Sequence, residues 1–346
     1  MNGIIKHIIS NEKDFAELKG HWKELETGSE MTCFQSYEWN KLLYSIWNKR
    51  VFNRLLYKIV VYEAKTVIAP LIVPNYNFVC KLLGKKAAIR FLGTGGYSDY
   101  LNFIYSEASS LESVIKHIKE ENHSFRLWLG DVDQDCSVNG ILADYKASEM
   151  VCVGVKVENS VEEYNAKLSK HTKQNLRTAH NRMEKDSIQY AYEIKLGILD
   201  DVLIEKLCQI HFSRVMNKNK IDGSSLKSRI RSTIHLYRLK NSELHTNVIK
   251  DAMKTMDDSF TLLVKLNGEI VGYLYGFVER GRIVRICQNC FNEEYHFYSP
   301  VFRACYDFLC DCCGHHEYEW IDFTRGDESY KYKLGGVEKK IISYEV

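Results

Sequence analysis

The sequence has little of several features that mark particular classes of protein. It contains only three prolines, so no proline-rich linker separates its parts. Its net charge is only +2, because basic and acidic residues are almost equal in number. The overall charge therefore does not indicate nucleic acid or an anionic membrane as a partner. No apolar run approaches the length of a membrane-spanning helix, and the polar residues behind Met1 are not typical of a signal peptide. We therefore expect a cytoplasmic protein without a membrane span.

The cysteines do not form the pattern of a disulfide framework. Their number, 11, is odd, and most of them lie inside apolar runs such as 151–153. We therefore expect reduced thiols in a cytoplasm. Cys287 and Cys290 are three positions apart within an expected strand, so their side chains point to opposite faces and do not share a metal. We expect buried structural cysteines and no metal site.

The length of 346 residues suggests about two domains, and the order of the expected elements agrees. We place the domains at 1–150 and 151–346, the second with a helical section at 160–240. In the second half we expect three strands, a helix after Ser299 and Pro300, and one more strand; the strands cover 260–266, 270–278, 283–291 and the residues around Trp320. Such a crossover helix implies that the last two strands are parallel.

The first half repeats this order less clearly. Strands are expected at 54–62 and 67–73, with Pro70 and Pro74 placing the second at a sheet edge or ending it early. A helix at 110–121 and a strand at 125–129 follow. The predicted fold class is therefore α/β (α+β), with mixed sheets flanked by helices in both halves.

The helical section begins with a capping box, because Glu163 follows Ser160 by three residues. We expect one long helix from there to about 185, with an apolar stripe on one face and a basic face that includes Lys173 and Arg177. The basic face is either solvated or a phosphate-binding surface for a nucleotide-sugar, a lipid-linked precursor or tRNA. Two further helices are expected near 199–215 and 224–239.

The residues from Trp320 to Gly335 combine a short apolar strand with a charged loop. Asp322 lies inside the strand, where an ionised carboxylate is costly unless it is paired. Loops at strand ends are common places for binding and catalytic groups. A second such loop contains Tyr97, Asp99 and Tyr100 after two glycines, and it either decorates a hairpin or faces a cleft between the halves.

From Asp322 the sequence reads Asp-Phe-Thr-Arg-Gly-Asp-Glu-Ser-Tyr-Lys-Tyr-Lys-Leu-Gly. In order and spacing it resembles the C-terminal signature of the CelD/BcsL-type acetyltransferases, which belong to the GNAT superfamily and are related to the Fem-type peptidyltransferases. Phe34-Gln35-Ser36 followed by Trp39, and Asn175-Leu176-Arg177 among basic residues, extend the resemblance. It implies two GNAT-like domains.

The resemblance also implies how a site would be built. In a GNAT enzyme a helix N-terminus holds the pyrophosphate of the acyl carrier, a splayed strand offers an amide to the thioester, and a base or water takes the amine proton. The cofactor-binding helix start would be Ser299, Pro300, Val301 and Phe302. The family's usual glycine after Ser-Pro is Val301 here, and the spaced glycines usual in GNAT pyrophosphate loops are missing.

The charged loop supplies the candidates for the remaining roles. The candidate bases are Asp322, Asp327 and Tyr330. Arg325 and Lys331 are expected to bind an anionic group of the substrate or donor, with Asp322 orienting Arg325; the alternative is that Asp322 and Arg325 make only a folding contact. Lys173, Arg177, Tyr97, Asp99 and Tyr100 complete the expected substrate-binding residues.

We therefore expect an acyl-CoA-dependent N-acyltransferase that moves an acetyl group to an amine. By resemblance, the acceptor is a sugar-containing cell-envelope or polysaccharide precursor, either a small sugar-nucleotide or lipid-linked. One alternative is an aminoacyl-tRNA-dependent, Fem-like peptidyltransferase. The other is a GNAT-fold binding module without catalysis. The sequence leaves the acceptor, the acyl chain and the oligomeric state open.

Overall fold

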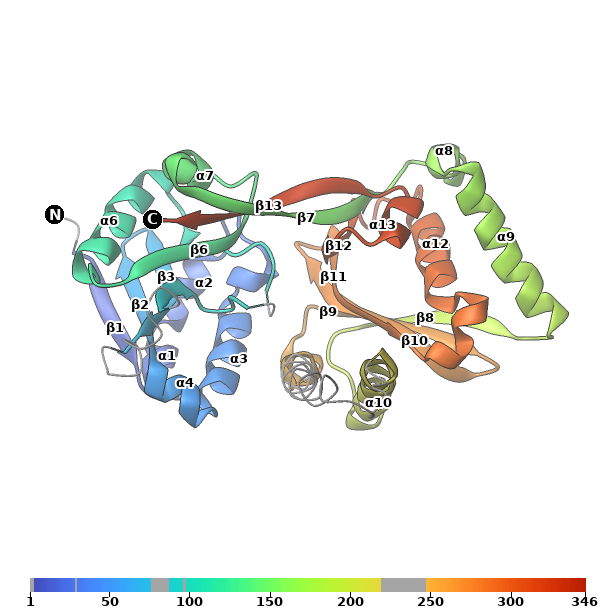
Figure 1. The fold of residues 1–346 in the computed structure, drawn as a ribbon, viewed down its shortest axis with the longest axis horizontal. Coiled ribbons are helices and arrows are strands. Elements are labelled where there is room, and N and C mark those ends of the chain that lie inside the picture. Colours follow the sequence, from blue (N-terminus) through green and yellow to red (C-terminus); the bar gives the residue numbers. More distant parts are fainter. Residues whose placement is uncertain (1–2, 29, 76–86, 96–97, 219–246) are drawn as a thin grey trace, which may run out of the picture. The chain divides into compact units, whose positions relative to one another are not determined.

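A computed structural model describes residues 3–28, 30–75, 87–95, 98–218 and 247–346. The chain forms two compact units, shown in Figure 1. The first unit consists of Met1–Val151 and Lys339–Val346, and the second of Cys152–Glu338. The final residues thus return to the first unit. Within the described residues, no helix is both long and apolar enough to cross a membrane.

The first unit is a mixed sheet with helices packed on it. Its strands, in spatial order, are β1 (Ile5–Ile9), β2 (Tyr57–Ala64), β3 (Val67–Pro74), β4 (Ala88–Phe91), β6 (Arg126–Asp133) and β13 (Val337–Glu345), with β5 (Ile104–Tyr105) paired to β3. Its helices are α1 (Glu12–Glu17), α2 (Lys19–Leu25), α3 (Tyr37–Asn48), α4 (Val51–Leu56), α6 (Leu111–Glu121) and α7 (Val138–Leu142). Phe15, Trp22, Tyr37 and Tyr44 form a buried aromatic cluster beneath the first three helices.

The prediction that Pro70 places β3 at a sheet edge is wrong. β3 pairs with β2 along its whole length and with other strands on its opposite side. On that side the partner changes from β5, which pairs with Val67 and Ile68, to β4, which pairs with Leu71 and Ile72. Pro70 lies at the change of partner, where its missing N–H interrupts no regular ladder.

The second unit has the strand order β7–β12–β11–β10–β9–β8. The strands are β7 (Lys146–Lys156, entering this unit at Cys152), β8 (Tyr190–Leu196), β9 (Ser259–Leu266), β10 (Glu269–Glu279), β11 (Ile283–Phe291) and β12 (Trp320–Arg325). Strands β9, β10 and β11 form the antiparallel meander that the sequence predicts. Helix α12 (Pro300–Cys312) crosses over, and β12 then pairs parallel to β11, as predicted.

The predicted long helix after Ser160 is instead two helices. They are α8 (Val161–Lys167) and α9 (Lys170–Lys185). The break occurs because Ser169 adopts an extended conformation and its hydroxyl caps α9 by accepting from the amide of Thr172. The next predicted helix is α10 (Asp201–Lys218), whereas the one predicted at 224–239 lies outside the described residues.

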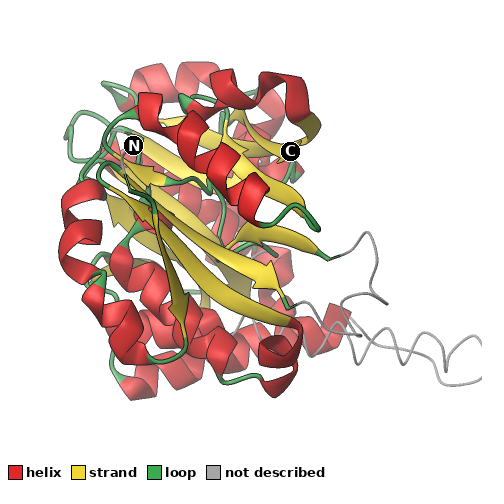
Figure 2. Ribbon diagram, turned by 90° about the vertical axis from the view of Figure 1, so that its left-hand side faces the viewer, coloured by secondary structure: helices red, strands yellow, loops and turns green. Residues whose placement is uncertain are grey.

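Helices cover both faces of the second sheet (Figures 1 and 2). Alternate residues of β9, such as Phe260, Leu262 and Val264, pack with the apolar face of α12 in one core. Helix α10 contacts β10 and β11 and buries residues such as Ile204 and Leu207. In a strand whose two faces are both covered by helices, successive side chains point to opposite faces and both sets are buried.

A buried ion cluster joins three strands of this sheet. Arg285 on β11 is only 4% exposed. Its guanidinium donates to Glu279 on β10 and, at 2.6 Å, to the carboxylate of Asp322 on β12. Asp322 also accepts from the amide of Thr324 at 2.7 Å. The cluster satisfies the buried charges and fixes the first residues of the parallel pair.

Replacing Arg285 by methionine should lower the free energy of unfolding by about 3–5 kcal/mol, because two buried carboxylates lose their cation. Urea denaturation measures the change. The matched control is Arg282→Met, which breaks the exposed ion pair with Glu319 and should cost at most about 1 kcal/mol. Equal losses in the two variants would contradict a structural role for the buried cluster.

Candidate functional site

Strands β11 and β12 separate from each other midway along the sheet. They pair at only three positions, from Ile283 opposite Trp320 to Arg285 opposite Asp322. β11 continues to Phe291 and β12 to Arg325 without further pairing between them. Two parallel strands that diverge leave a wedge-shaped opening with backbone on both sides.

A bulge turns β11 away from its neighbour. Tyr275 of β10 lies opposite Gln288, but the next residue, Gly276, lies opposite Ile286, so Cys287 is the extra residue. Gly276 is required at this point, because a Cβ there would lie 1.7 Å from the carbonyl oxygen of Arg285. The bulge therefore depends on a glycine in the facing strand.

β12 bends on the other side of the opening. Thr324 has a φ of +54°, in the left-handed region that β-branched residues rarely adopt. Its hydroxyl donates to the carbonyl oxygen of Ile286 at 2.9 Å, which holds the bend against β11. Backbone strain of this kind is frequent at functional sites.

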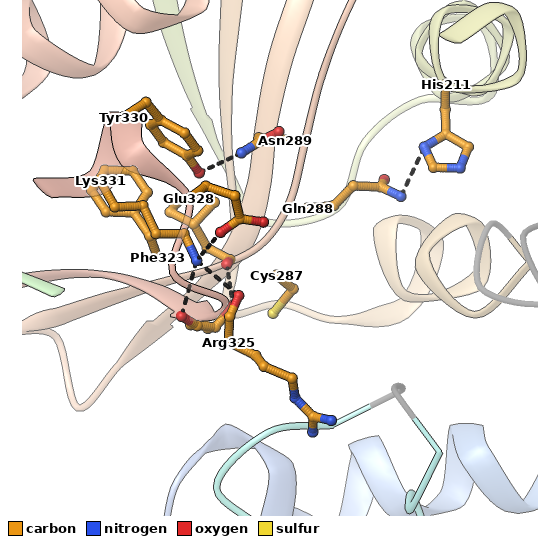
Figure 3. A pocket seen from close by; sticks show the side chains of 11 residues that line it. His211, Cys287, Gln288, Asn289, Phe323, Arg325, Glu328, Tyr330 and Lys331 are labelled. Atoms are coloured by element: carbon orange, nitrogen blue, oxygen red, sulfur yellow. Dashed lines mark hydrogen bonds and ion pairs between the residues drawn. The ribbon is translucent and has the colours of Figure 1, made fainter. Parts of the chain in front are cut away.

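A pocket of about 450 Å³ occupies the opening (Figure 3). It is lined by His211 from α10, by Ile286, Cys287, Gln288 and Asn289 from β11, by Phe323, Thr324 and Arg325 from β12, and by Glu328, Tyr330 and Lys331 from the following loop. Arg325, Glu328 and Lys331 are the charged side chains of the lining. The pocket is large enough for a small acyl group and part of an acceptor.

Lys331, on the short helix α13 (Ser329–Lys333), stabilises the bend between β12 and the following loop. It is 2% exposed, and its ammonium donates to the carbonyl oxygens of Thr324, Arg325 and Gly326 at 2.8–3.1 Å. It also pairs with Glu328 at 3.0 Å. The three carbonyls and one carboxylate account for the hydrogen-bonding capacity of the ammonium.

Tyr330 lines three pockets that are formed by described residues of this unit. Its side chain lines the pocket between β11 and β12 and two smaller pockets of about 300 and 190 Å³. Burial raises the pKa of its phenol well above the usual range. The amide of Asn289 donates to the phenol oxygen at 2.5 Å. Tyr330 is therefore a neutral phenol whose own hydrogen remains available as a donor.

The two smaller pockets flank the start of α12. Ser299, with a φ of +48°, precedes the helix, Pro300 begins it, and both line the 190 Å³ pocket together with Val301 and Phe302. The amides of Val301 and Phe302 occupy the first turn, where a helix leaves its N–H groups without intrahelical partners. The helix starts where the sequence predicts.

Val301 does not fill the space in front of this helix start. It is 8% exposed, and its Cγ2 lies 2.6 Å from the position that a Cβ would take at Gly272 on β10. Its side chain is thus directed toward the sheet, into room that Gly272 provides. A valine in place of the glycine that the resemblance implies is therefore compatible with an open helix N-terminus.

Two arginines hold the segment that leads into α12. Arg214 on α10 donates to the carbonyl oxygen of Asn289 at 2.9 Å and lies over the ring of Phe291. Arg182 on α9 donates to the carbonyl oxygen of Phe297 at 2.8 Å and lies over the ring of Phe297. Arg214 lines the 190 Å³ pocket and Arg182 the 300 Å³ pocket, so each small pocket has a cationic side chain beside the helix N-terminus.

The structure separates the residues that the sequence groups around Asp322. Tyr330, Arg325 and Lys331 line the large pocket, whereas Asp322 is buried beside it and accepts from Arg285. The sequence suggested Arg325 as the residue that Asp322 orients, and the ion pair of Asp322 is with Arg285 instead. Asp327 is exposed and is not among the residues that line these three pockets.

The other expected substrate-binding residues lie elsewhere. Lys173 and Arg177 are exposed on α9, while the flank of α9 that lines the 300 Å³ pocket includes Thr178 and Arg182. In the first unit, Tyr100 is 1% exposed, so its ring belongs to the core. Asp99 is half-buried in the same unit, and Tyr97 lies outside the described residues.

Several lining residues were not predicted from the sequence. His211, Gln288 and Asn289 come from α10 and from β11 beyond the bulge. The adjacent polar pair Gln288-Asn289, at the end of an apolar strand that follows Gly276, was the available signal. Glu328, next to Asp327, is the acidic side chain in the lining. In the described part of the chain, no group of three or more His, Cys, Asp or Glu side chains could hold a metal ion.

Comparisons with known proteins agree with this architecture. Residues 170–332 match the family model described as an acetyltransferase (GNAT) domain. A conserved protein of unknown function from Bacteroides thetaiotaomicron VPI-5482 has a similar structure, with a TM-score of 0.54 and 12% identity, over 99% of this chain and 100% of that chain. A search of curated proteins gives no match.

Two further solved structures are similar over most of their length. The C-terminal domain (DUF2156) of a putative lysylphosphatidylglycerol synthetase from Agrobacterium fabrum has a TM-score of 0.54 and 9% identity, over 97% of this chain and 92% of that chain. L-PGS from Bacillus licheniformis has a TM-score of 0.52 and 10% identity, over 88% of this chain and 90% of that chain. At these identities the similarity concerns the fold.

The family match covers the meander, the crossover helix and the charged loop, which together build the pockets. The predicted resemblance and the predicted pair of GNAT-like units are both confirmed. Residues 170–332 therefore form a GNAT acetyltransferase domain, as the resemblance to the CelD/BcsL type implies.

Proposed function

We propose that the chain transfers an acetyl group from acetyl-CoA to the amine of a sugar-containing cell-envelope or polysaccharide precursor. The observation that supports this most is the position of Tyr330. It lines the pocket between the diverging strands and both pockets beside the start of α12. One phenol thus lies where an acyl group and the carrier that delivers it would meet.

The residues at the start of α12 fit the phosphates of coenzyme A. The first-turn amides of Val301 and Phe302 and the positive end of the helix dipole favour an anion there. Arg214 and Arg182 line the pockets on either side. When bound, coenzyme A supplies the acyl group as a thioester. The carrier arm then has the opening between β11 and β12 as its path toward Cys287 and Gln288.

Tyr330 is better suited to act as an acid than as a base. Because burial raises the pKa of its phenol, the side chain keeps its hydrogen throughout the neutral range. Asn289 donates to the phenol oxygen, which leaves the phenol hydrogen to be given to a neighbouring atom. The sulfur that leaves as a thiolate requires such a donor. We therefore assign Tyr330 the hydrogen bond to the leaving sulfur: as the C–S bond breaks, the sulfur takes the proton of the phenol, and the proton lost by the acceptor nitrogen returns to the phenol oxygen.

The remaining residues of the loop have supporting roles in this proposal. Lys331 binds three carbonyl oxygens of the bend and holds Tyr330 and Glu328 against the opening. Asp322 forms a buried ion pair with Arg285 that holds β11 and β12 together, so we do not assign it the role of base. Glu328, the acidic side chain in the lining, is placed to attract the ammonium form of an acceptor amine.

The sugar-containing acceptor rests on the resemblance to CelD/BcsL-type proteins. Arg325 lines the large pocket and offers a planar cation for a phosphate or carboxylate of such a precursor. An acceptor with both an amine and an anionic group would match Glu328 and Arg325 together. Amino-sugar nucleotides and lipid-linked amino sugars have this combination.

A thiol-release assay tests the proposed function directly. Acetyl-CoA incubated with the protein and a panel of amino-sugar nucleotides should release free coenzyme A only when an acceptor amine is present. Release with no member of the panel, combined with no binding of acetyl-CoA in calorimetry, would reject the proposal. Retention of aminoacyl-tRNA in place of coenzyme A would indicate the Fem-like alternative, and binding of neither donor would indicate a non-catalytic module.

Replacing Tyr330 by phenylalanine should lower kcat about 10²- to 10⁴-fold, the usual contribution of a general acid. The Kd for acetyl-CoA should stay the same, because the ring and its packing remain. Steady-state kinetics and calorimetry measure the two effects. Tyr332→Phe is the matched control, since Tyr332 lies two residues away on the same helix and its hydroxyl binds Glu338 on the surface. A kcat for Tyr330→Phe equal to that of the control would rule out the acid role.

A further inference from the structure

Two hydrogen bonds link helix α10 to the phenol of Tyr330 through one asparagine of β11. Nη1 of Arg214 on α10 donates to the backbone carbonyl oxygen of Asn289 at 2.9 Å and to its side-chain oxygen, Oδ1, at 3.2 Å. Nδ2 of the same side chain donates to the hydroxyl oxygen of Tyr330 at 2.5 Å, as Figure 3 shows. The amide of Asn289 therefore connects a guanidinium with the phenol.

The guanidinium decides which end of this amide faces the phenol. A guanidinium has only donors, so the atom of Asn289 that faces Arg214 is the oxygen. The opposite end is then the NH₂ group, which can only donate, and the phenol oxygen of Tyr330 accepts its bond. The hydroxyl hydrogen takes no part in that bond, and within the described residues no acceptor binds it. It remains for a molecule in the pockets that Tyr330 lines.

From this chain we infer that Arg214 is a positioning residue for the transfer, because through Asn289 it directs the hydroxyl hydrogen of Tyr330 to the leaving sulfur. The inference rests on the proposed function, in which the phenol gives its proton to the sulfur as the C–S bond breaks. Asn289 is the second positioning residue. Without Arg214, the amide can turn its oxygen toward the phenol and accept the hydrogen itself.

The same two residues also favour release of the proton. Burial raises the pKa of the Tyr330 phenol, whereas the hydrogen bond from Asn289 and the charge of Arg214 lower it. The phenolate that forms as the sulfur takes the proton therefore keeps an N–H donor. It becomes a phenol again when it takes the proton lost by the acceptor nitrogen.

Replacing Asn289 by aspartate should reverse the bond to the phenol. The carboxylate still accepts from Arg214, but it can only accept from Tyr330, so the phenol hydrogen is bound to the protein. The kcat should fall about 10- to 100-fold, since a hydrogen bond to a charged acceptor must break before the sulfur is protonated. Asn165→Asp is the matched control and should leave kcat unchanged. Asn165 already accepts from the hydroxyl of Tyr306, and neither residue lines the three pockets.

A double variant shows whether Asn289 acts through the phenol. Tyr330→Phe has no hydroxyl hydrogen to direct, so adding Asn289→Asp to it should lower kcat by less than about two-fold more. A further loss as large as that in the wild-type background would overturn the inference, because the aspartate would then affect the reaction without the phenol. A normal kcat in Asn289→Asp alone would overturn it as well.

Arg214 is tested with methionine and with lysine at its position. Arg214→Met should lower kcat at saturating acetyl-CoA about two- to ten-fold, the contribution of one neutral hydrogen bond, because nothing then fixes the amide. Arg214→Lys keeps a group that only donates and should restore most of kcat. The KM for acetyl-CoA should also rise in Arg214→Met, since Arg214 lines the 190 Å³ pocket. A rise in KM with an unchanged kcat would limit Arg214 to donor binding and overturn its positioning role.

The outcomes separate this inference from the proposed function. If the wild-type protein transfers the acetyl group and Tyr330→Phe is impaired, but the Asn289 and Arg214 variants keep a normal kcat, only the positioning role is rejected. A wild-type protein that releases coenzyme A with no acceptor amine, or a Tyr330→Phe variant with a normal kcat, would reject the acid role and the positioning role with it. Urea denaturation separates a loss of kcat from a loss of the fold.

Discussion

The separation of β11 from β12 is the constraint on which the candidate site depends. The buried Arg285 holds the two strands together up to Asp322, and the bulge at Cys287 and the bend at Thr324 force them apart immediately beyond. Each feature has a matching partner, since Gly276 makes room for the bulge and Lys331 binds the carbonyls of the bend. A wedge between paired strands is costly unless both sides are supported in this way.

The first unit contains a parallel pair of the same kind, and among its described residues another segment lies beside β6 beyond that pair. β4 and β6 pair at three positions, from Ala88 opposite Arg126 to Arg90 opposite Trp128. Beyond these three positions, Leu101 lies beside β6, because its amide donates to the carbonyl oxygen of Asp131 on β6 at 2.8 Å. Gln35 binds the carbonyl oxygen of Tyr100 from the other side. Among the described residues, the three pockets of the proposed acyl-donor site are lined by side chains of the second unit.

The sequence predicted the meander, the crossover helix and the parallel last strand, because each has local signals such as Asn267-Gly268 and Ser299-Pro300. It also proposed Tyr330, Lys331 and Arg325 as site residues from one continuous motif, and all three line the large pocket. It did not predict the contacts of Asp322 with Arg285 or the presence of His211, since these join residues 37 and 77 positions apart. The positive φ of Thr324 also gave no signal, because threonine does not favour that conformation.

The central claim is that the wedge between β11 and β12, together with the start of α12, receives the acyl donor. Hydrogen–deuterium exchange of the backbone amides, with and without acetyl-CoA, tests it most directly. Bound acetyl-CoA should slow exchange at Cys287–Asn289 and at Val301 and Phe302, and leave the first unit unchanged. Binding of acetyl-CoA that protects neither segment, or that protects the first unit instead, would contradict the account.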